Sequence, residues 1–371
     1  MQAASRASAL VALALLLGAC SAPVAPPASS PADGHDAAPP ASSAAEGRPA
    51  AASAAAAAEP TATAPPAPMR VRFSFSSISG IGIPYWAALK AGLFTRQGLE
   101  VEQGYSVATA AMSALIAGDV DLLTSAGSEL VAANVEGADI VGVAGTLNKV
   151  VQAFMAAPGL SEPSALRGHQ VGVTRYGSLS DFSARYLLRN WGLQPDTDVA
   201  IVQIGGIPEI LAAFSAGGLD AGVLTPPQTL QATDLGFVEL ANLWSQPIEY
   251  PGSVLVMHRA TQPEQEEMVR RFLRGLAEAV HLVRTDRDLA IRALAAGTQT
   301  NDARALAATY DIYTPLFERD LRLSRAAVQT AVDQLAASNP RAAGVDVDRM
   351  IDMRFVDELA RSGFVDRLYA Q

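Results

Sequence analysis

Short apolar runs alternate with helix-patterned stretches along residues 70–262 of this 371-residue chain. Residues 71–75 alternate apolar and polar side chains, as a half-buried strand does, and residues 221–224 form a continuous apolar run. Strands are predicted over residues 71–75, 120–124, 140–144, 152–156, 170–174, 199–204, 221–224, 237–240 and 253–258. Helices are predicted over residues 84–94, 108–117, 128–135, 179–191, 208–216 and 228–233, and throughout the region after Pro263. This alternation predicts an α/β fold with mainly parallel sheets flanked by helices.

One internal repeat favours two related lobes. The sequence of residues 114–121 is ALIAGDVD, and that of residues 213–220 is AFSAGGLD. Each segment has the pattern of a helix end, a glycine turn and an aspartate that leads into a strand. Their separation is too long for a solenoid repeat and fits one lobe facing another. Independent helix–turn–strand segments could also match in this way. In either case we expect Asp121 and Asp220 to hold their turns together.

Polar loops follow several of the predicted strands. Because open α/β sheets bind ligands beyond the carboxyl ends of their strands, and clefts between domains are favoured ligand sites, we expect a binding cleft between the two lobes.

The amino-terminal segment has the pattern of an export signal. Arg6 precedes the apolar residues 9–17, and small residues lead to Cys20, the only cysteine. The apolar run is too short to span a bilayer of about 30 Å. A cysteine at this place resembles the lipobox of bacterial lipoproteins, in which the thiol is lipidated and the chain is cut before it. The resemblance implies a signal peptide over residues 1–19 and a lipid anchor on Cys20; the alternative is an ordinary signal peptide with a chance cysteine.

Residues 20–68 differ in composition from the rest of the chain. They are rich in Ala, Pro, Ser and Thr and contain no aromatic residue. Such a segment buries too little apolar surface to offset the entropy of ordering, so we predict a disordered tether.

Charge and motif content exclude several function classes. The formal net charge of −10 at pH 7 argues against nucleic-acid binding, which favours a basic surface. The four histidines are scattered singly, and the folded part has no cysteine, so no zinc or thiolate site is expected. The chain has no G-x-S-x-G, P-loop or G-x-G-x-x-G motif. We therefore predict a protein that is not an enzyme and that binds no metal or cofactor.

Residues 72–101 resemble the start of periplasmic substrate-binding proteins of ABC importers. The subgroup is the nitrate, sulfonate, taurine and thiamine-precursor (NMT1/THI5-like, SsuA/TauA-like) family. Residues 117–121 and 171–178 also match segments of that family, and the resemblance covers nearly all of residues 70–371. Within residues 72–101, the family has the pattern G-[LF]-F-x-x-x-G-[LI]-x-V. The positions that fit this pattern are Gly92, Phe94, Gly98, Leu99 and Val101.

The resemblance implies the two-lobed periplasmic-binding-protein type II fold. Lobe I would comprise residues 69–157 and 253–371, and lobe II residues 158–252. The implied protein is a periplasmic monomer, anchored to a membrane, that delivers a small and anionic solute of the sulfonate, nitrate or taurine kind to an ABC permease. The alternatives are a solute sensor or adaptor without transport and, less favoured, an exported enzyme.

The same resemblance and the polar loops indicate which residues contact the solute. From lobe I we expect Ser77, Ser79, Gly80, Trp86, Ser125 and Gly127. From lobe II we expect Arg175, Tyr176, Gly177, Ser178, Thr225 and Pro226. Three of these positions have a structural alternative: Ser178 or Ser180 could cap a helix, Arg175 could pair with Asp181 or another surface carboxylate, and Trp86 could be a core residue.

Replacement of Cys20 by Ser is expected to move the protein from the membrane fraction to the soluble extracytoplasmic fraction, because the variant lacks the thiol that carries the lipid. Fractionation followed by immunoblotting measures this, with Ser29→Ala in the tether as the control that stays in the membrane. Retention of the Cys20→Ser protein in the membrane would show that Cys20 is not the anchor.

Overall fold

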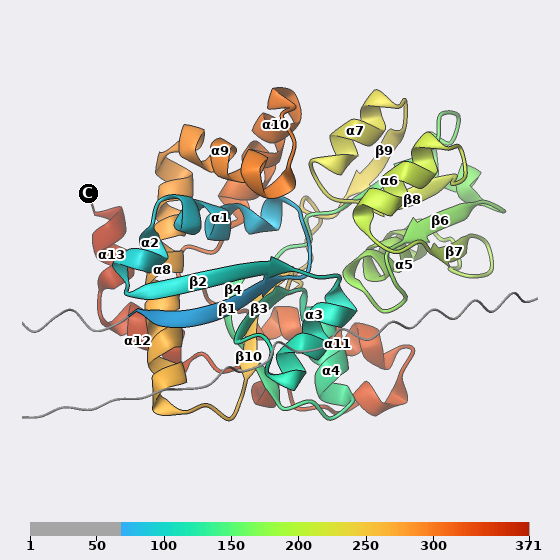
Figure 1. Cartoon of the computed structure of the whole chain (residues 1–371). Helices are drawn as coiled ribbons and strands as arrows, with labels where there is room; N and C mark the ends of the chain where they lie inside the picture. The colour runs from blue at the N-terminus through green and yellow to red at the C-terminus, as the bar shows by residue number, and fades with distance from the viewer. Residues whose placement is uncertain (1–67, 371) are drawn as a thin grey trace, which may run out of the picture. The chain divides into compact units, whose positions relative to one another are not determined.

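Two five-stranded sheets organise residues 68–370, the part of the chain that the computed structural model describes (Figure 1). The predicted signal peptide, Cys20 and the tether up to residue 67 lie outside the described residues. Among the described helices, none combines the length and apolar character that a membrane crossing requires.

The first sheet has the strand order β2-β1-β3-β10-β4. β1 pairs parallel with β2 and β3, and β10 pairs antiparallel with β3 and β4. β10 therefore runs against the other four strands. The strands are β1 (Met69–Phe75), β2 (Leu99–Tyr105), β3 (Leu122–Ser125), β4 (Ile140–Leu147) and β10 (Ser253–His258).

The second sheet repeats this arrangement with the order β7-β6-β8-β5-β9. β6 pairs parallel with β7 and β8, whereas β5 pairs antiparallel with β8 and β9. The prediction of mainly parallel sheets is thus confirmed, with one reversed strand in each. The strands are β5 (Ala153–Ala156), β6 (Gln170–Val173), β7 (Ala200–Gln203), β8 (Ala221–Leu224) and β9 (Val238–Asn242).

The reversed strands mark where the chain changes sheets. β5 is the first strand of the second sheet, and β10 returns the chain to the first. The prediction assigns residues 69–157 to lobe I, but β5 belongs to the second sheet, so the change occurs between β4 and β5. The hydrophobic pattern cannot reveal this, because a continuous apolar strand such as β5 fits the interior of either sheet.

The two repeat aspartates occupy matching places. The Asp121 carboxylate accepts the backbone N–H of Arg72 in β1 at 2.8 Å, and the Asp220 carboxylate accepts that of Gln170 in β6 at 3.0 Å. Each aspartate thus ties the start of the strand that follows it, β3 or β8, to the parallel neighbour. These bonds run between strands and not within the turns, where the sequence predicted them.

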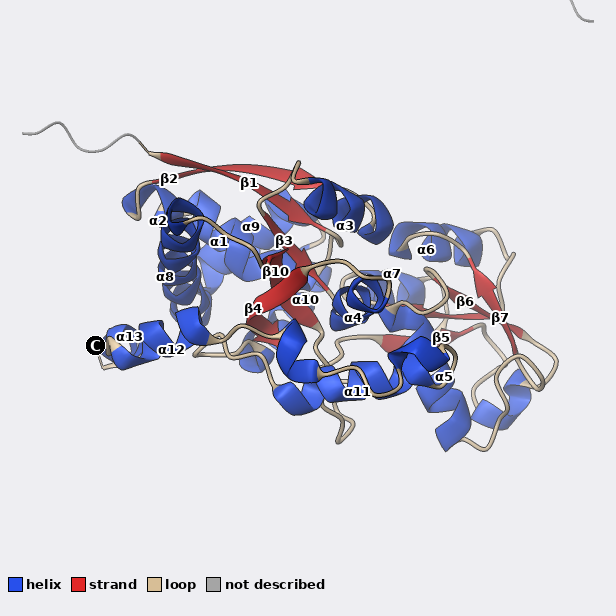
Figure 2. Cartoon of the chain, turned by 90° about the horizontal axis from the view of Figure 1, so that it is seen from below, coloured by secondary structure: helices blue, strands red, loops and turns tan. Residues whose placement is uncertain are grey.

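Helices lie on both sides of the strands (Figure 2). In chain order they are α1 (Ile83–Lys90), α2 (Leu93–Arg96), α3 (Ala108–Ala117), α4 (Gly127–Val135), α5 (Leu179–Asn190), α6 (Ile207–Ser215), α7 (Gln228–Asp234), α8 (Pro263–Thr285), α9 (Arg287–Thr298), α10 (Ala303–Tyr313), α11 (Arg325–Ala336), α12 (Arg354–Arg361) and α13 (Phe364–Tyr369). The helical character predicted after Pro263 is confirmed.

One local prediction is wrong, and one strand is missing from the prediction. The single helix expected over residues 84–94 is divided into α1 and α2, because Gly92 adopts the left-handed conformation with φ of 66°. The strand β2 was not expected, since its sequence LEVEQGY carries exposed charges and a glycine. β2 is an edge strand of the first sheet, where solvent accepts such side chains.

Aromatic side chains form the centre of the core beside the first sheet. Phe272 of α8 stacks on Phe94 with ring centroids 4.4 Å apart and lies 5.3 Å from Phe73 of β1. Phe73 in turn stacks on Tyr85 of α1 at 5.1 Å. These contacts fix α1 and α8 on the sheet, and with them the loop that connects β1 to α1.

Replacing Phe272 by Ala is expected to lower the free energy of unfolding by about 3–5 kcal/mol, because a fully buried ring leaves a cavity that its neighbours cannot fill. Denaturant unfolding measures the change. Leu235→Ala is the control, since Leu235 is 47% exposed, and its effect should stay within about 0.5 kcal/mol. Similar losses in both variants would contradict the assignment of Phe272 to the core.

Candidate functional site

Buried polar side chains gather at one edge of the first sheet, where β3 and β4 end and β10 begins. Thr146 donates to the hydroxyl of Ser253 at 2.7 Å, and Thr124 lies 3.2 Å from that same hydroxyl. The hydroxyl of Tyr85 is buried near these three side chains and has no hydrogen-bond partner among the described residues. Burial raises the pKa of Tyr85, and the neighbouring hydroxyl groups offset part of that rise. The strand ends thus hold a neutral, hydroxyl-rich surface.

Ser125 belongs to the same edge and is 3% exposed. Its hydroxyl has no hydrogen-bond partner among residues 68–370, although a buried hydroxyl without one costs about 1–3 kcal/mol. An unsatisfied group of this kind is best explained by a ligand or water that completes it.

The loop after β1 rests on α10. Ser79 is fully buried and Ser77 donates to its hydroxyl at 3.4 Å. A side chain at Gly80 would overlap the ring of Tyr313, which explains the glycine by packing. The Tyr313 hydroxyl is buried without a partner among the described residues, and burial raises its pKa.

The loop after β6 contains a triangle of hydroxyl groups. Thr174 and Ser178 lie 2.9 Å apart, and Ser180 lies 2.9 Å from Thr174 and 3.0 Å from Ser178. Ser178 occupies the N-cap position of α5 without a side-chain capping bond. The Ser180 hydroxyl instead accepts the backbone N–H of Thr174 at 2.9 Å. These bonds hold the loop in place against the start of α5.

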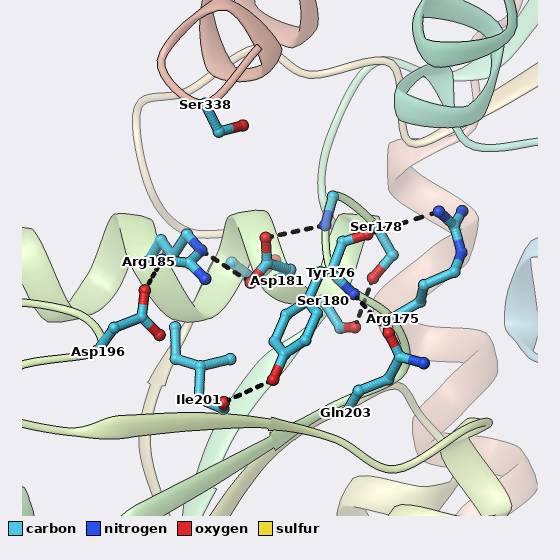
Figure 3. Close-up of polar contacts among 12 residues, drawn as sticks. Arg175, Tyr176, Ser178, Ser180, Asp181, Arg185, Asp196, Ile201, Gln203 and Ser338 are labelled. Carbon is cyan, nitrogen blue, oxygen red and sulfur yellow. Dashed lines mark hydrogen bonds and ion pairs between the residues drawn. The ribbon is translucent and has the colours of Figure 1, made fainter.

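Backbone N–H groups of this loop already have partners. The N–H of Tyr176 donates to the Gln203 side chain at 3.2 Å, and the N–H of Gly177 donates to Asp181 at 3.0 Å (Figure 3). Tyr176 is 52% exposed, and its hydroxyl donates to the carbonyl of Ile201 in the edge strand β7 at 3.1 Å. Tyr176 therefore lies along the outer edge of the second sheet.

On the second sheet, Thr225 follows β8 and resembles Ser125 in its environment. Thr225 is 4% exposed, and its hydroxyl has no partner among the described residues. The side-chain oxygen of Gln228, in the first turn of α7, is also buried without one. Pro226 lies between these two residues. Unsatisfied polar groups thus occur at the carboxyl edges of both sheets.

An ion pair joins the two halves of the site. Arg175 of the second half lies 3.6 Å from Glu129 in the first turn of α4, which follows β3. Glu129 is 7% exposed, and Ser128 donates to it at 3.0 Å. Burial raises the pKa of Glu129, and the nearby guanidinium of Arg175 offsets part of that rise.

Sequence reasoning missed Glu129, because an acid in the first turn of a helix is ordinarily a solvated partner of the helix dipole. The only feature of the sequence that could have indicated Glu129 as a site residue is its position four residues after Ser125, directly beyond the end of a strand. The pairing of Arg175 with Asp181 is not formed. Asp181 instead bonds Arg185 at 2.8 Å.

The two connections between the sheets lie in contact beside this ion pair. The N–H of Tyr250 donates to the carbonyl of Asn148 at 3.2 Å, and the Tyr250 ring stacks on Phe182 of α5 at 4.3 Å. The N–H of Gly127 donates to the carbonyl of Pro251 at 2.7 Å. Gly127 thus supports the returning chain, and its N–H is already bonded.

Trp86 packs in the core, as the structural alternative predicted. It is 7% exposed, and its ring lies 5.5 Å from that of Phe75. It also lines a surface hollow of about 330 Å³ together with Lys90 and Gln103. No group of three or more potential metal-ligating side chains occurs among residues 68–370.

Comparison with known proteins agrees with this architecture. The model of the family described as NMT1/THI5 like matches residues 82–290. The chain belongs to this family. A search of the curated proteins found no matching relative.

Solved structures share the fold across most of the chain. The alkanesulfonate-binding protein SsuA from Xanthomonas axonopodis pv. citri, bound to MOPS, has a TM-score of 0.65 and 18% identity, covering 77% of this chain and 99% of its own. The periplasmic aliphatic sulphonate binding protein SsuA from Escherichia coli has a TM-score of 0.64 and 21% identity, covering 77% and 92%. The periplasmic nitrate-binding protein NrtA from Synechocystis PCC 6803 has a TM-score of 0.62 and 13% identity, covering 80% and 89%. The two-lobed periplasmic-binding-protein fold is thereby confirmed.

Gly127→Ala is expected to lower the free energy of unfolding by about 1–3 kcal/mol, because a methyl group there would overlap the Pro251 ring and separate α4 from the returning chain. Gly104→Ala in β2 is the matched control, since nothing lies within 4 Å of its added carbon. Thermal or denaturant unfolding compares the two. Equal stability of both variants would contradict a structural role for the Gly127–Pro251 contact.

Proposed function

We propose that this protein binds a small solute with an anionic group between its two sheets and delivers that solute to an ABC permease. The observation that carries the proposal is a set of buried hydroxyl groups at the carboxyl edges of both sheets, Ser125 on one side and Thr225 on the other, that have no hydrogen-bond partner among residues 68–370. A solute placed between these edges would satisfy them at once. An open cleft in this place stays a prediction.

Arg175 is the proposed anchor for the anionic group. Its guanidinium is one-third exposed, in contact with the opposite half of the site, and has N–H donors to spare beyond the Glu129 contact. Sulfonate and carboxylate groups suit a guanidinium because two parallel hydrogen bonds can form. The names of the structural neighbours, which describe sulfonate-binding and nitrate-binding proteins, support an anionic solute.

Family membership supports the rest of the proposal. Solute-binding proteins of importers capture their ligand by closing two lobes, which shifts a population toward the state that the solute binds better. We propose that the protein acts as a monomer in the periplasm, held at a membrane by lipidated Cys20 and the tether of residues 20–68. Transport, rather than catalysis, is the role that the family favours.

The test begins with thermal unfolding of the full chain in the presence of sulfonates, nitrate, carboxylates, aromatic acids and thiamine precursors. A solute at 100 times its dissociation constant adds about 2.7 kcal/mol of apparent stability, which such a screen detects. Stabilisation by an anionic solute supports the proposal, and no stabilisation by any of these classes would contradict it.

For the anion that binds best, Arg175→Ala is expected to weaken affinity by about 1.5–3 kcal/mol, because a charge-assisted hydrogen bond is lost. Isothermal titration calorimetry measures the change. Arg189→Ala on the exposed side of α5 is the control and should leave affinity unchanged. Equal affinity in the Arg175→Ala variant and the parent would remove Arg175 from the site.

A further inference from the structure

We propose that Arg304 and Asp234 form an electrostatic latch that holds the two halves of the protein together without help from a solute. Arg304 belongs to α10, Asp234 is the last residue of α7, and the Arg304 guanidinium donates to the Asp234 carboxylate. The latch goes beyond the proposed function, because it concerns how closure is controlled and not which solute is bound. Closed here means the arrangement in which this ion pair is formed.

The two helices that carry the pair belong to different halves. α10 packs against α9 and the segment Gly80–Gly82 on the half built around the first sheet, whereas α7 packs against α6, β5 and β9 on the other half. Figure 1 shows α10 in orange and α7 in yellow side by side. Of the ion pairs formed among residues 68–370, this one and the Arg175–Glu129 pair join the halves, and the others lie within one half.

Each of the two charges is disfavoured by its own helix. Arg304 is the second residue of α10, where the backbone N–H groups leave a partial positive charge that disfavours a cation. Asp302 caps that helix by accepting the N–H groups of Arg304 and Ala305, each at 3.0 Å, which offsets part of that charge. Asp234 ends α7, where the backbone carbonyls leave a partial negative charge that disfavours an anion. A charge that opposes its local preference indicates a role outside its own element.

The two placements create surfaces of opposite charge that face each other. The guanidinium adds to the positive end of α10, and the carboxylate adds to the negative end of α7. Attraction between the two ends is strongest when the halves touch. Separation of the halves leaves each charge beside a helix end of its own sign. The pair therefore favours the closed arrangement without occupying the region between Ser125 and Thr225 where the solute is proposed to bind.

The latch is the more salt-sensitive of the two ion pairs between the halves. The side chain of Arg304 is 63% exposed and that of Asp234 is 50% exposed, so dissolved ions reach both groups and screen their attraction. Glu129, in contrast, is 7% exposed, so its contact with Arg175 is screened less. An exposed pair changes an equilibrium by only about two- to fivefold. A contact of this strength adjusts the closed population and still lets the protein open.

The test measures the distance between the halves in the absence of solute. Spin labels are attached to Arg292→Cys in α9 and Ala212→Cys in α6, both exposed positions, in the full chain with Cys20→Ser so that no third thiol is labelled. Pulsed dipolar electron paramagnetic resonance gives the ratio of closed to open molecules. Between about 10 mM and about 0.5 M salt, we expect this ratio to fall about two- to fivefold, because salt screens the latch.

Asp234→Arg is expected to lower the closed-to-open ratio at low salt and to reverse its salt dependence, because two cations then face each other and salt screens their repulsion. The double variant Arg304→Asp with Asp234→Arg should recover part of the ratio. Its charges attract again, but each now opposes the charge of its own helix end. Asp311→Arg is the matched control, since Asp311 pairs with Arg287 within one half, and it should leave the ratio and its salt dependence unchanged.

Three outcomes would overturn the latch: no closed population in the parent, a closed population that does not respond to salt, or a double variant no more closed than Asp234→Arg. Should Asp234→Arg fail to fold, Asp234→Asn decides, and a salt response equal to that of the parent would overturn the latch. Because the distances are measured without solute, they do not depend on the proposed function. A confirmed latch in a protein that no solute stabilises in the thermal screen would contradict the proposed function alone.

Discussion

The contact between the two chain crossings is the constraint on which the rest of the structure depends. Tyr250, Pro251 and Gly252 return the chain to the first sheet directly beside residues 148 and 149, and a side chain at Gly252 would overlap the Lys149 carbonyl. The same short segment bonds Gly127 at the start of α4 and stacks on Phe182 of α5. One segment therefore fixes two helices from different sheets at the point where both sheets present their strand ends.

This constraint explains why residues far apart in sequence form one site. Ser125 ends β3, and Gly127 and Glu129 follow it. Arg175, Ser178 and Thr225 follow strands of the other sheet. In each sheet the crossing strand is the reversed one, so the carboxyl ends of the other strands share an edge with the crossing. Glu129 and Arg175 then come within 3.6 Å across that junction. Rotation about a hinge at this point would change the distance between Glu129 and Arg175 while leaving the pairing within each sheet intact.

The chemistry of the junction is mostly neutral. At the first sheet, the hydroxyl groups of Thr124 and Thr146 bond that of Ser253. At the second sheet, a separate cluster is formed by the hydroxyl groups of Thr174, Ser178 and Ser180. Both clusters hold their loops without adding charge. Against this background the Arg175–Glu129 pair is a charged contact between the two halves. Selectivity among small polar solutes would then depend on these two groups, with the hydroxyls accepting whatever polar atoms lie between. Family membership supports a role in solute capture.

The sequence by itself determined the α/β class, most of the helices and strands and the two-lobed architecture, because these follow from local periodicity and from turn chemistry that acts over a few residues. It also indicated the loops at the strand ends, since a polar loop after an apolar strand is visible in the chain. It could not show that β5 belongs to the second sheet, that β2 is a strand, or that the Gly127 N–H is bonded to Pro251, because each depends on a partner distant in sequence. Only the tertiary structure decided that Glu129 is buried opposite Arg175, since burial of an acid in the first turn of a helix depends on what the other lobe places over it.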